Sequence, residues 1–210
     1  MKRKGIRIKV FFACLLLWYT ATSVFSQEQT KRILFVGNSY TYFWNLPRTI
    51  QEMGQSQGKE WTIRQSTAGG SSWEDHWKGK KKLNTRSIIK EGTWDLIILQ
   101  NHSLSTIEDP DGFKAYGDSL ILLAKGTGAE VMLYQTWARK ANPLMLTTIK
   151  NGYERLAERH QLAVIQVGEV WEYVRQLRPE LELYDPDGSH PSTIGTYLTG
   201  CIFYSMIAGE

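Results

Sequence analysis

The fold is decided by one stretch of sequence, Leu34-Phe35-Val36-Gly37-Asn38-Ser39-Tyr40-Thr41. An apolar run that ends in a glycine, a polar residue and a serine is typical of a buried strand that leads into a turn and a helix. Ser39 is therefore expected at the end of a strand, with its hydroxyl exposed to a ligand. A serine hydroxyl in that place is a candidate nucleophile if an imidazole lies within hydrogen-bond reach.

Short apolar runs alternate with amphipathic stretches along the chain, and this alternation favours a parallel sheet. The strands are predicted over residues 32–36, 61–64, 95–99, 130–134 and 163–167. Helical spacing of apolar side chains predicts helices around residues 46–53, 113–123, 146–157 and 194–202, with Ile194, Tyr197, Leu198, Cys201 and Ile202 on the apolar face of the last. The predicted fold class is α/β: a three-layer α/β/α sandwich with a five-stranded parallel sheet, flavodoxin-like.

In an open parallel sheet, ligands bind beyond the carboxyl ends of the strands, where the strand order reverses. Ser39 follows the first predicted strand directly. The segments 69–73, 100–103 and 135–137 follow the next three strands and are rich in glycine, polar and aromatic residues. We expect all of these segments to lie near Ser39 at the carboxyl edge of the sheet, which is called the rim below.

A second motif, Asp187-Gly188-Ser189-His190, precedes the last predicted helix. The spacing of three allows the Asp187 carboxylate and the His190 imidazole to face the same serine from one short turn. Asp185 is an alternative carboxylate. Each motif alone is common in turns, but a serine after the first strand together with a histidine before the last helix predicts a serine hydrolase.

These two motifs resemble the first and last blocks of the SGNH or GDSL-type hydrolases, and the resemblance spans nearly all of residues 27–210. Asn38 stands where that family usually has aspartate. The resemblance implies that Ser39 is the nucleophile, His190 the general base and then acid, and Asp187 the group that orients the imidazole. It also suggests a branch of the family that is common among secreted bacterial proteins.

The second and third blocks of that family supply donors for the oxyanion of the attacked carbonyl. The resemblance implies a glycine after the second strand, which is Gly69 or its neighbour Gly70, with Gly69 preferred. The usual Gly-x-Asn-Asp of the third block is absent, so Asn101 or Gln100 is the candidate there, with Asn101 preferred. The expected oxyanion hole therefore consists of the N–H of Ser39, Gly69 and Asn101.

Aromatic side chains gather in the same rim segments, and their faces suit sugar rings. Tyr40, Trp73 and Trp137 are the expected substrate-binding residues. No metal or organic cofactor is required by the triad mechanism. A metal site of His76, His102 and Asp75 is the alternative, but these residues lack the close ligand pair that is typical of zinc sites.

Residues 1–26 have the pattern of an export signal, with five basic side chains, no acidic ones and an apolar stretch from residue 10 to 25. Cleavage is expected after Ser26, and an uncleaved anchor is the alternative. The remaining 20 basic and 21 acidic side chains leave residues 27–210, the predicted hydrolase-like domain, about neutral. This balance predicts no nucleic-acid partner. The apolar stretch is shorter than the roughly 20 residues of a membrane helix, so no stable membrane insertion is expected after cleavage.

The predicted protein is an exported serine esterase, periplasmic or extracellular, that hydrolyses small acyl esters, acetyl above all, through an acyl-serine intermediate. A carbohydrate ester is the preferred substrate, and lipid or thioester substrates are alternatives. A glycan-binding protein that keeps the hydrolase fold without catalysis is the rival hypothesis. An exported structural or adhesive protein is a third, although the sequence lacks the repeats usual in such proteins.

Overall fold

The computed structural model describes residues 30–209, so the predicted export signal lies outside the described residues. A five-stranded sheet with the order β2-β1-β3-β4-β5 forms the middle layer, and every neighbouring pair of strands is parallel. The strands are β1 (Lys31–Gly37), β2 (Trp61–Thr67), β3 (Leu96–Leu99), β4 (Glu130–Gln135) and β5 (Ala163–Gln166). The prediction of a five-stranded parallel sheet is confirmed.

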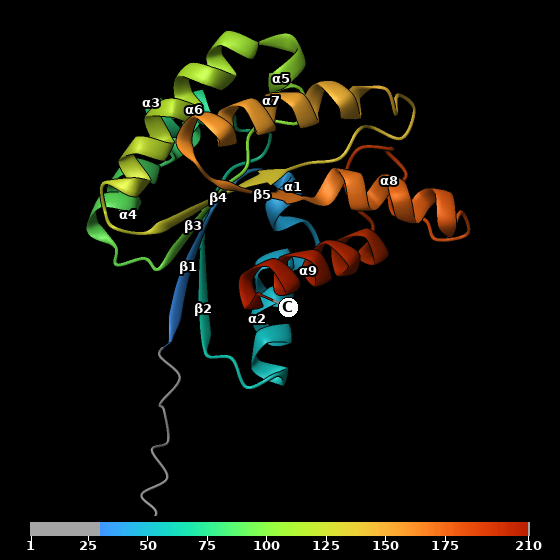
Figure 1. The fold of residues 1–210 in the computed structure, drawn as a ribbon, viewed down its shortest axis with the longest axis horizontal. Helices are drawn as coiled ribbons and strands as arrows, with labels where there is room; N and C mark the ends of the chain where they lie inside the picture. The colour runs from blue at the N-terminus through green and yellow to red at the C-terminus, as the bar shows by residue number, and fades with distance from the viewer. Residues whose placement is uncertain (1–29, 210) are drawn as a thin grey trace, which may run out of the picture.

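Helices cover both faces of this sheet (Figure 1). The longer helices are α2 (Leu46–Ser56), α6 (Pro110–Lys125), α7 (Met145–His160), α8 (Val167–Leu177) and α9 (Thr193–Ala208). The shorter ones are α1 (Ser39–Tyr42), α3 (Trp73–Lys78), α4 (Thr85–Glu91), α5 (Ser105–Glu108) and the 3-10 turns η1 (Phe43–Asn45) and η2 (Lys80–Lys82). The three-layer α/β/α architecture is the one that the alternating sequence predicts.

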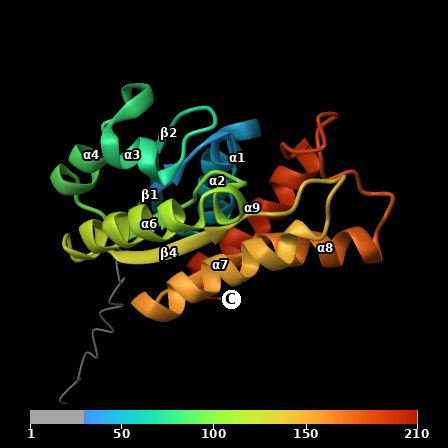
Figure 2. The same cartoon turned by 90° about the horizontal axis from the view of Figure 1, so that it is seen from above.

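Alternate residues of the strands point to opposite faces, and this alternation divides the core into two clusters. Leu34 and Val36 of β1 join the cluster under α3, α4, α6 and α7. Ile33 and Phe35 join the cluster under α2, α8 and α9. α6 and α7 contact each other and both contribute to the first of these clusters, and Figure 2 shows the two helices on either side of β4 in the view from above.

The strand order places the end of β1 at the point where the chain reverses direction across the sheet. The chain passes from β1 to β2 on one side and then to β3 on the other side. Gly37 at the end of β1 lies opposite Thr67 of β2, so the segments that follow these strands begin at the same edge of the sheet. This edge is where open parallel sheets bind ligands, and Ser39 lies there as expected.

The predicted apolar face of the last helix is wrong. Ile194, Tyr197 and Cys201 are exposed, and only Leu198 and Ile202 of that stripe pack against the core. The buried residues of α9 are Gly195, Thr196, Thr199, Gly200, Phe203 and Ile207. Glycine decides the face, because a Cβ at position 200 would lie 3.2 Å from the Met53 methyl group of α2.

Among residues 30–209, no helix combines the length and apolar character needed to cross a membrane.

Candidate active site

The turn Gly37-Asn38-Ser39, which carries the candidate nucleophile and is called the nucleophile turn below, begins with a glycine that has no room for a side chain. A Cβ at Gly37 would lie 2.4 Å from both Gln100 Oε1 and Thr41 Oγ1. Asn38 then caps α1, since its Oδ1 accepts the N–H of Tyr40 at 3.0 Å. The cap fixes Ser39 as the first residue of α1. The backbone N–H of a residue in that position has no partner within its own helix, so it remains available to a ligand.

The structure brings Ser39, His190 and Asp187 into one hydrogen-bonded chain, although Ser39 and His190 are 151 residues apart. Ser39 Oγ lies 2.9 Å from His190 Nε2, and His190 Nδ1 lies 2.5 Å from Asp187 Oδ2. A carboxylate accepts only, so Nδ1 carries the proton and Nε2 is free to accept the proton of the serine hydroxyl. This arrangement can activate a serine nucleophile.

Asp187 is held ionised by its surroundings. Partial burial raises the pKa of its carboxyl, but hydrogen bonds from the His190 ring and from the backbone outweigh that effect, so the pKa lies below its usual value. Oδ1 accepts the N–H groups of Ser189 at 2.8 Å and His190 at 2.9 Å. The side chain of Asp185, the alternative carboxylate, forms no hydrogen bond or ion pair with His190.

Aromatic rings hold the imidazole and the nucleophile turn in place. The Phe43 ring stacks on His190 with a centroid distance of 4.3 Å. Tyr40 meets His190 edge-on, and its hydroxyl lies 2.6 Å from Ser189 Oγ. Tyr40 also stacks on Trp137 at 4.7 Å, and Trp137 stacks on Trp171 at 3.8 Å, so three nearly parallel rings extend from the site into the core.

Ser39 and His190 border an open cavity of about 360 Å³. The residues that line it are Asn38, Ser39, Tyr40, Tyr42, Phe43, Gly69, Gly70, His102, Ser103, Arg139, Ser189 and His190. A volume of this size is at the lower end of the range for small-molecule sites, which is about 300–1,000 Å³.

Both candidate glycines of the oxyanion loop line this cavity. Lys81 Nζ donates to the carbonyl groups of Gly69 at 3.1 Å and Gly70 at 2.7 Å. These two hydrogen bonds restrain the conformation of the Gly69-Gly70 loop. Gly70 has a φ of 58°, a left-handed conformation that favours glycine.

Gln100 and Asn101, the two candidates for the third oxyanion donor, are both buried, and neither lines the cavity. Gln100 Oε1 accepts the N–H of Asn38 at 2.8 Å and the hydroxyl of Thr41 at 3.0 Å, and its Nε2 donates to the carbonyl of Asn101. Gln100 therefore holds the nucleophile turn. Asn101 Oδ1 accepts the N–H groups of Trp73 and His102, each at 2.8 Å, which leaves the donor end of the Asn101 amide free of hydrogen bonds to residues 30–209.

Two of the three predicted substrate-binding aromatics are not available to a ligand. Tyr40 lines the cavity, but Trp73 is fully buried against Phe113 and Tyr153, and Trp137 is 1% exposed. Ser72 caps α3 with a capping box, and this helix start turns Trp73 inward. Trp137 supports the site instead, because its indole N–H donates to the carbonyl of Ser189 at 3.0 Å.

The two histidines of the alternative metal site do not come together with Asp75 as a group of metal ligands. His76 is buried, and its Nδ1 lies 2.6 Å from Thr85 Oγ1 while its Nε2 lies 3.0 Å from the carbonyl of Gly37. Burial lowers the pKa of His76 to about 4, so the ring is neutral near pH 7. His102 lines the cavity. No group of three or more metal-ligating side chains forms within the part of the chain that the structure describes.

Sequence reasoning did not name Phe43 and Arg139, which also line the cavity, and gave no role to Ser103 and Ser189, although both lie in segments expected there. Phe43 is close to the first motif, so its sequence position could have indicated it. Arg139 lies two residues beyond the predicted rim segment 135–137, and a single arginine after a strand carries no recognisable pattern.

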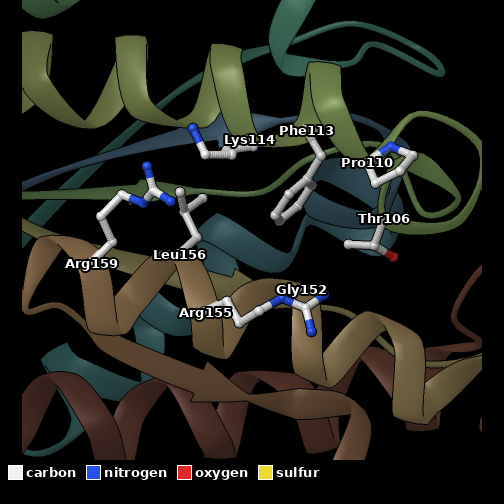
Figure 3. A pocket seen from close by; sticks show the side chains of 8 residues that line it. All are labelled: Thr106, Pro110, Phe113, Lys114, Gly152, Arg155, Leu156 and Arg159. Atoms are coloured by element: carbon white, nitrogen blue, oxygen red, sulfur yellow. The ribbon is translucent and has the colours of Figure 1, made fainter.

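A second cavity, of about 220 Å³, lies between α6 and α7 (Figure 3). Phe113 and Leu156 give it an apolar side, and the cationic side chains of Lys114, Arg155 and Arg159 border it. It shares no residue with the cavity at Ser39, and none of the residues that line it is a histidine, aspartate or glutamate. It therefore lacks a general base for hydrolysis.

No protein-family model matches this sequence, and no curated protein matches it. Solved structures do match it. A candidate SGNH hydrolase from Slackia heliotrinireducens is 23% identical with a TM-score of 0.72, over 85% of this chain and 99% of that one. A DUF4886 family protein from Bacteroides uniformis is 21% identical with a TM-score of 0.74, over 86% and 84%.

A family 3 carbohydrate esterase from Clostridium thermocellum is 10% identical with a TM-score of 0.67, over 86% of this chain and 97% of that one. These likenesses establish the fold as that of the SGNH hydrolases. The resemblance predicted from the sequence is confirmed at the level of the fold.

Proposed function

We propose that this protein is a serine esterase that removes small acyl groups, acetyl above all, from carbohydrates. One observation carries the proposal: Ser39, His190 and Asp187 form a continuous hydrogen-bonded chain beside an open cavity. The carbohydrate esterase of the same fold supports the substrate class. The cavity, at about 360 Å³, is large enough for a sugar ring and an acetyl group.

In this mechanism Ser39 Oγ attacks the ester carbonyl while His190 Nε2 takes the hydroxyl proton. The expected donors to the resulting oxyanion are the backbone N–H of Ser39 and the Gly69 loop. The third is the amide nitrogen of Asn101, which has no other partner among residues 30–209 although Asn101 does not line the cavity. His190 then gives the proton to the leaving alcohol, and acyl-Ser39 remains. A water molecule loses a proton to His190, attacks the acyl carbon and releases the carboxylic acid with a free Ser39.

Asp187 stabilises the imidazolium that forms in each half of this cycle. Gln100 and Lys81 act indirectly, since the first holds the nucleophile turn and the second holds the glycine loop. Both groups act before the substrate arrives, so little reorganisation is needed during the reaction.

The test of this proposal uses 4-nitrophenyl acetate and a serine-directed phosphonate. The protein should release nitrophenol and form a phosphonate adduct that mass spectrometry locates on Ser39. Ser39→Ala and His190→Ala should abolish both signals. Asp185→Asn is the matched control, because Asp185 lies in the same turn without a hydrogen bond or ion pair to the imidazole, and it should keep both signals. Turnover that survives Ser39→Ala would refute the proposal.

The rival function, glycan binding without catalysis, predicts saturable glycan binding with neither turnover nor labelling. Release of acetate from acetylated xylan, compared with hydrolysis of a long-chain nitrophenyl ester, separates a carbohydrate esterase from a lipase. Export is part of the proposal and is supported by the charge and apolar pattern of residues 1–26. Detection of the mature protein, beginning at Gln27, outside the cytoplasm would test it.

A further inference from the structure

The cavity at Ser39 contains a positive charge that has no partner. Arg139 follows β4 and lines the cavity together with Ser39 and His190. Its guanidinium forms neither a hydrogen bond nor an ion pair with any residue between 30 and 209, and its Nε is buried and unpartnered. Buried polar groups in folded proteins are nearly always hydrogen-bonded, so this site lacks an acceptor.

No carboxylate of the described residues forms an ion pair or hydrogen bond with the Arg139 guanidinium. No residue that lines the cavity is an aspartate or a glutamate. Asp187 is occupied by His190 and by two backbone N–H groups. Asp75, near the glycine loop, lies 3.2 Å from Lys81 Nζ. Glu108 acts on His102 from a distance, but Arg139 itself has no carboxylate within ion-pair distance among residues 30–209.

Two neighbouring groups respond to this charge. Burial raises the pKa of the Tyr40 hydroxyl, and the charge of Arg139 acts against that increase. Burial lowers the pKa of His102, and Arg139 adds to that decrease. Since Tyr40 and His102 both line the cavity, the field of the guanidinium extends across the space where a substrate binds.

The backbone on both sides of Arg139 is hydrogen-bonded to the segment that carries Asp187 and His190. The Ala138 carbonyl accepts the hydroxyl of Tyr184 at 2.7 Å, and the Lys140 N–H donates to the Gly188 carbonyl at 2.9 Å. Arg139 is thus held between two bonds to the segment that carries Asp187 and His190. These bonds fix where the side chain of Arg139 starts, beside Asp187 and His190.

We propose that Arg139 binds a carboxylate of the substrate, so that the preferred substrates are acyl esters of acidic sugars. This inference rests on the proposed esterase function of the same cavity. A guanidinium offers parallel N–H donors that match a carboxylate, and a single cation matches a single negative charge. Tyr42 and Phe43 on the cavity wall provide aromatic surface beside the sugar ring.

The test compares two acetyl esters that differ in one group: a methyl glucuronoside and a methyl glucoside, each acetylated on the same hydroxyl. The ratio of the two kcat/KM values should favour the acidic sugar by at least about tenfold, the usual effect of a hydrogen bond to a charged group. Arg139→Gln should bring this ratio close to one. A ratio measured on one preparation does not depend on how much of the variant is folded.

Arg155→Gln is the matched control. Arg155 also has no ion pair or hydrogen bond among the described residues, but it borders the separate cavity between α6 and α7 (Figure 3). Its loss changes the net charge of the protein by the same amount. The preference for the acidic ester should therefore remain in Arg155→Gln, and Arg139→Lys, which keeps the charge without the parallel donors, should give an intermediate ratio.

The outcomes separate this inference from the proposed function. If 4-nitrophenyl acetate is hydrolysed but the acidic ester is not preferred, or if Arg139→Gln keeps the preference, the inference is overturned and the esterase proposal stands. If no ester is hydrolysed, calorimetry with glucuronate and glucose still tests Arg139. Glucuronate binding that Arg139→Gln removes then supports the inference, and equal binding of the two sugars overturns it.

Discussion

Replacement of Gln100 by methionine is expected to loosen the nucleophile turn and to destabilise the fold. Gln100 is fully buried and makes three hydrogen bonds, to the N–H of Asn38, the hydroxyl of Thr41 and the carbonyl of Asn101. Methionine has a similar length but can replace none of these bonds. At about 1 kcal/mol for each bond, the free energy of unfolding should fall by about 3 kcal/mol.

Urea denaturation measures this loss. With an m-value of about 2 kcal/mol/M, the midpoint should fall by about 1.5 M. The kcat for 4-nitrophenyl acetate should fall at least about tenfold, because Asn38 precedes Ser39 and small displacements of a nucleophile are costly. A midpoint within about 0.3 M of the wild-type value, which is well below the loss of one bond at this m-value, would contradict the reasoning.

Thr41→Val is the partner variant for a double-mutant cycle. Thr41 is fully buried, and its hydroxyl donates to Gln100 Oε1. Alone, this substitution should cost about 1 kcal/mol. In the Gln100→Met background the hydroxyl has already lost that acceptor, so the additional cost should be close to zero. Strictly additive losses would show that the two side chains are not coupled.

Three further predictions concern the triad, a buried histidine and a close helix contact. Asp187→Asn should lower kcat for 4-nitrophenyl acetate by about 10³- to 10⁴-fold, whereas Asp185→Asn should change it less than about twofold; similar losses in both variants would remove the distinction between the two carboxylates. Because burial lowers the pKa of His76 from 6.5 to about 4, the unfolded chain binds a proton between these pH values that the folded chain does not. The free energy of unfolding should therefore fall by up to about 3 kcal/mol as the pH drops from 6.5 to 4, and this dependence should be smaller in His76→Gln, as urea titrations at several pH values would reveal. Gly195→Ala should destabilise the protein by about 1–3 kcal/mol, because the new Cβ would lie 2.1 Å from the Leu183 carbonyl oxygen; a thermal melt equal to that of the wild type would count against this contact.

The central part of the sheet was predictable because its strands are short, apolar and buried on both faces. β2 extends to Thr67, three residues beyond the predicted end. It is an edge strand with exposed polar residues, so its apolar signal stops early. The boundary between β5 and α8 was also missed, because Val167 begins the helix without an intervening loop.

The face of α9 was not predictable from periodicity, because apolar residues occur on all sides of this helix. Its small residues, such as Gly195 and Gly200, mark the closely packed side. The position of Trp73 was missed for a related reason. Aromatic residues after a strand occur both in rims and in cores, and the helix that begins at Ser72 decides between them. The Ser72-x-x-Asp75 capping box was the signal that could have indicated this helix.

The triad positions were the most predictable part of the site, because Ser39 and His190 each lie in a short motif at the end of an element. The roles of Arg139 and Gln100, in contrast, could not be predicted from the sequence. Their importance depends on which partners they have or lack in three dimensions, and no local pattern encodes that.

The stack of Tyr40, Trp137 and Trp171 gives the protein a built-in optical reporter. Rings this close and this nearly parallel couple their electronic transitions, and Trp137 and Trp171 are inclined by only 2°. Since Tyr40 is the chain neighbour of Ser39, the stack and the nucleophile turn form together. The part of the near-ultraviolet circular dichroism signal that Trp137→Phe removes is therefore expected to report when this stack forms beside Ser39 during refolding.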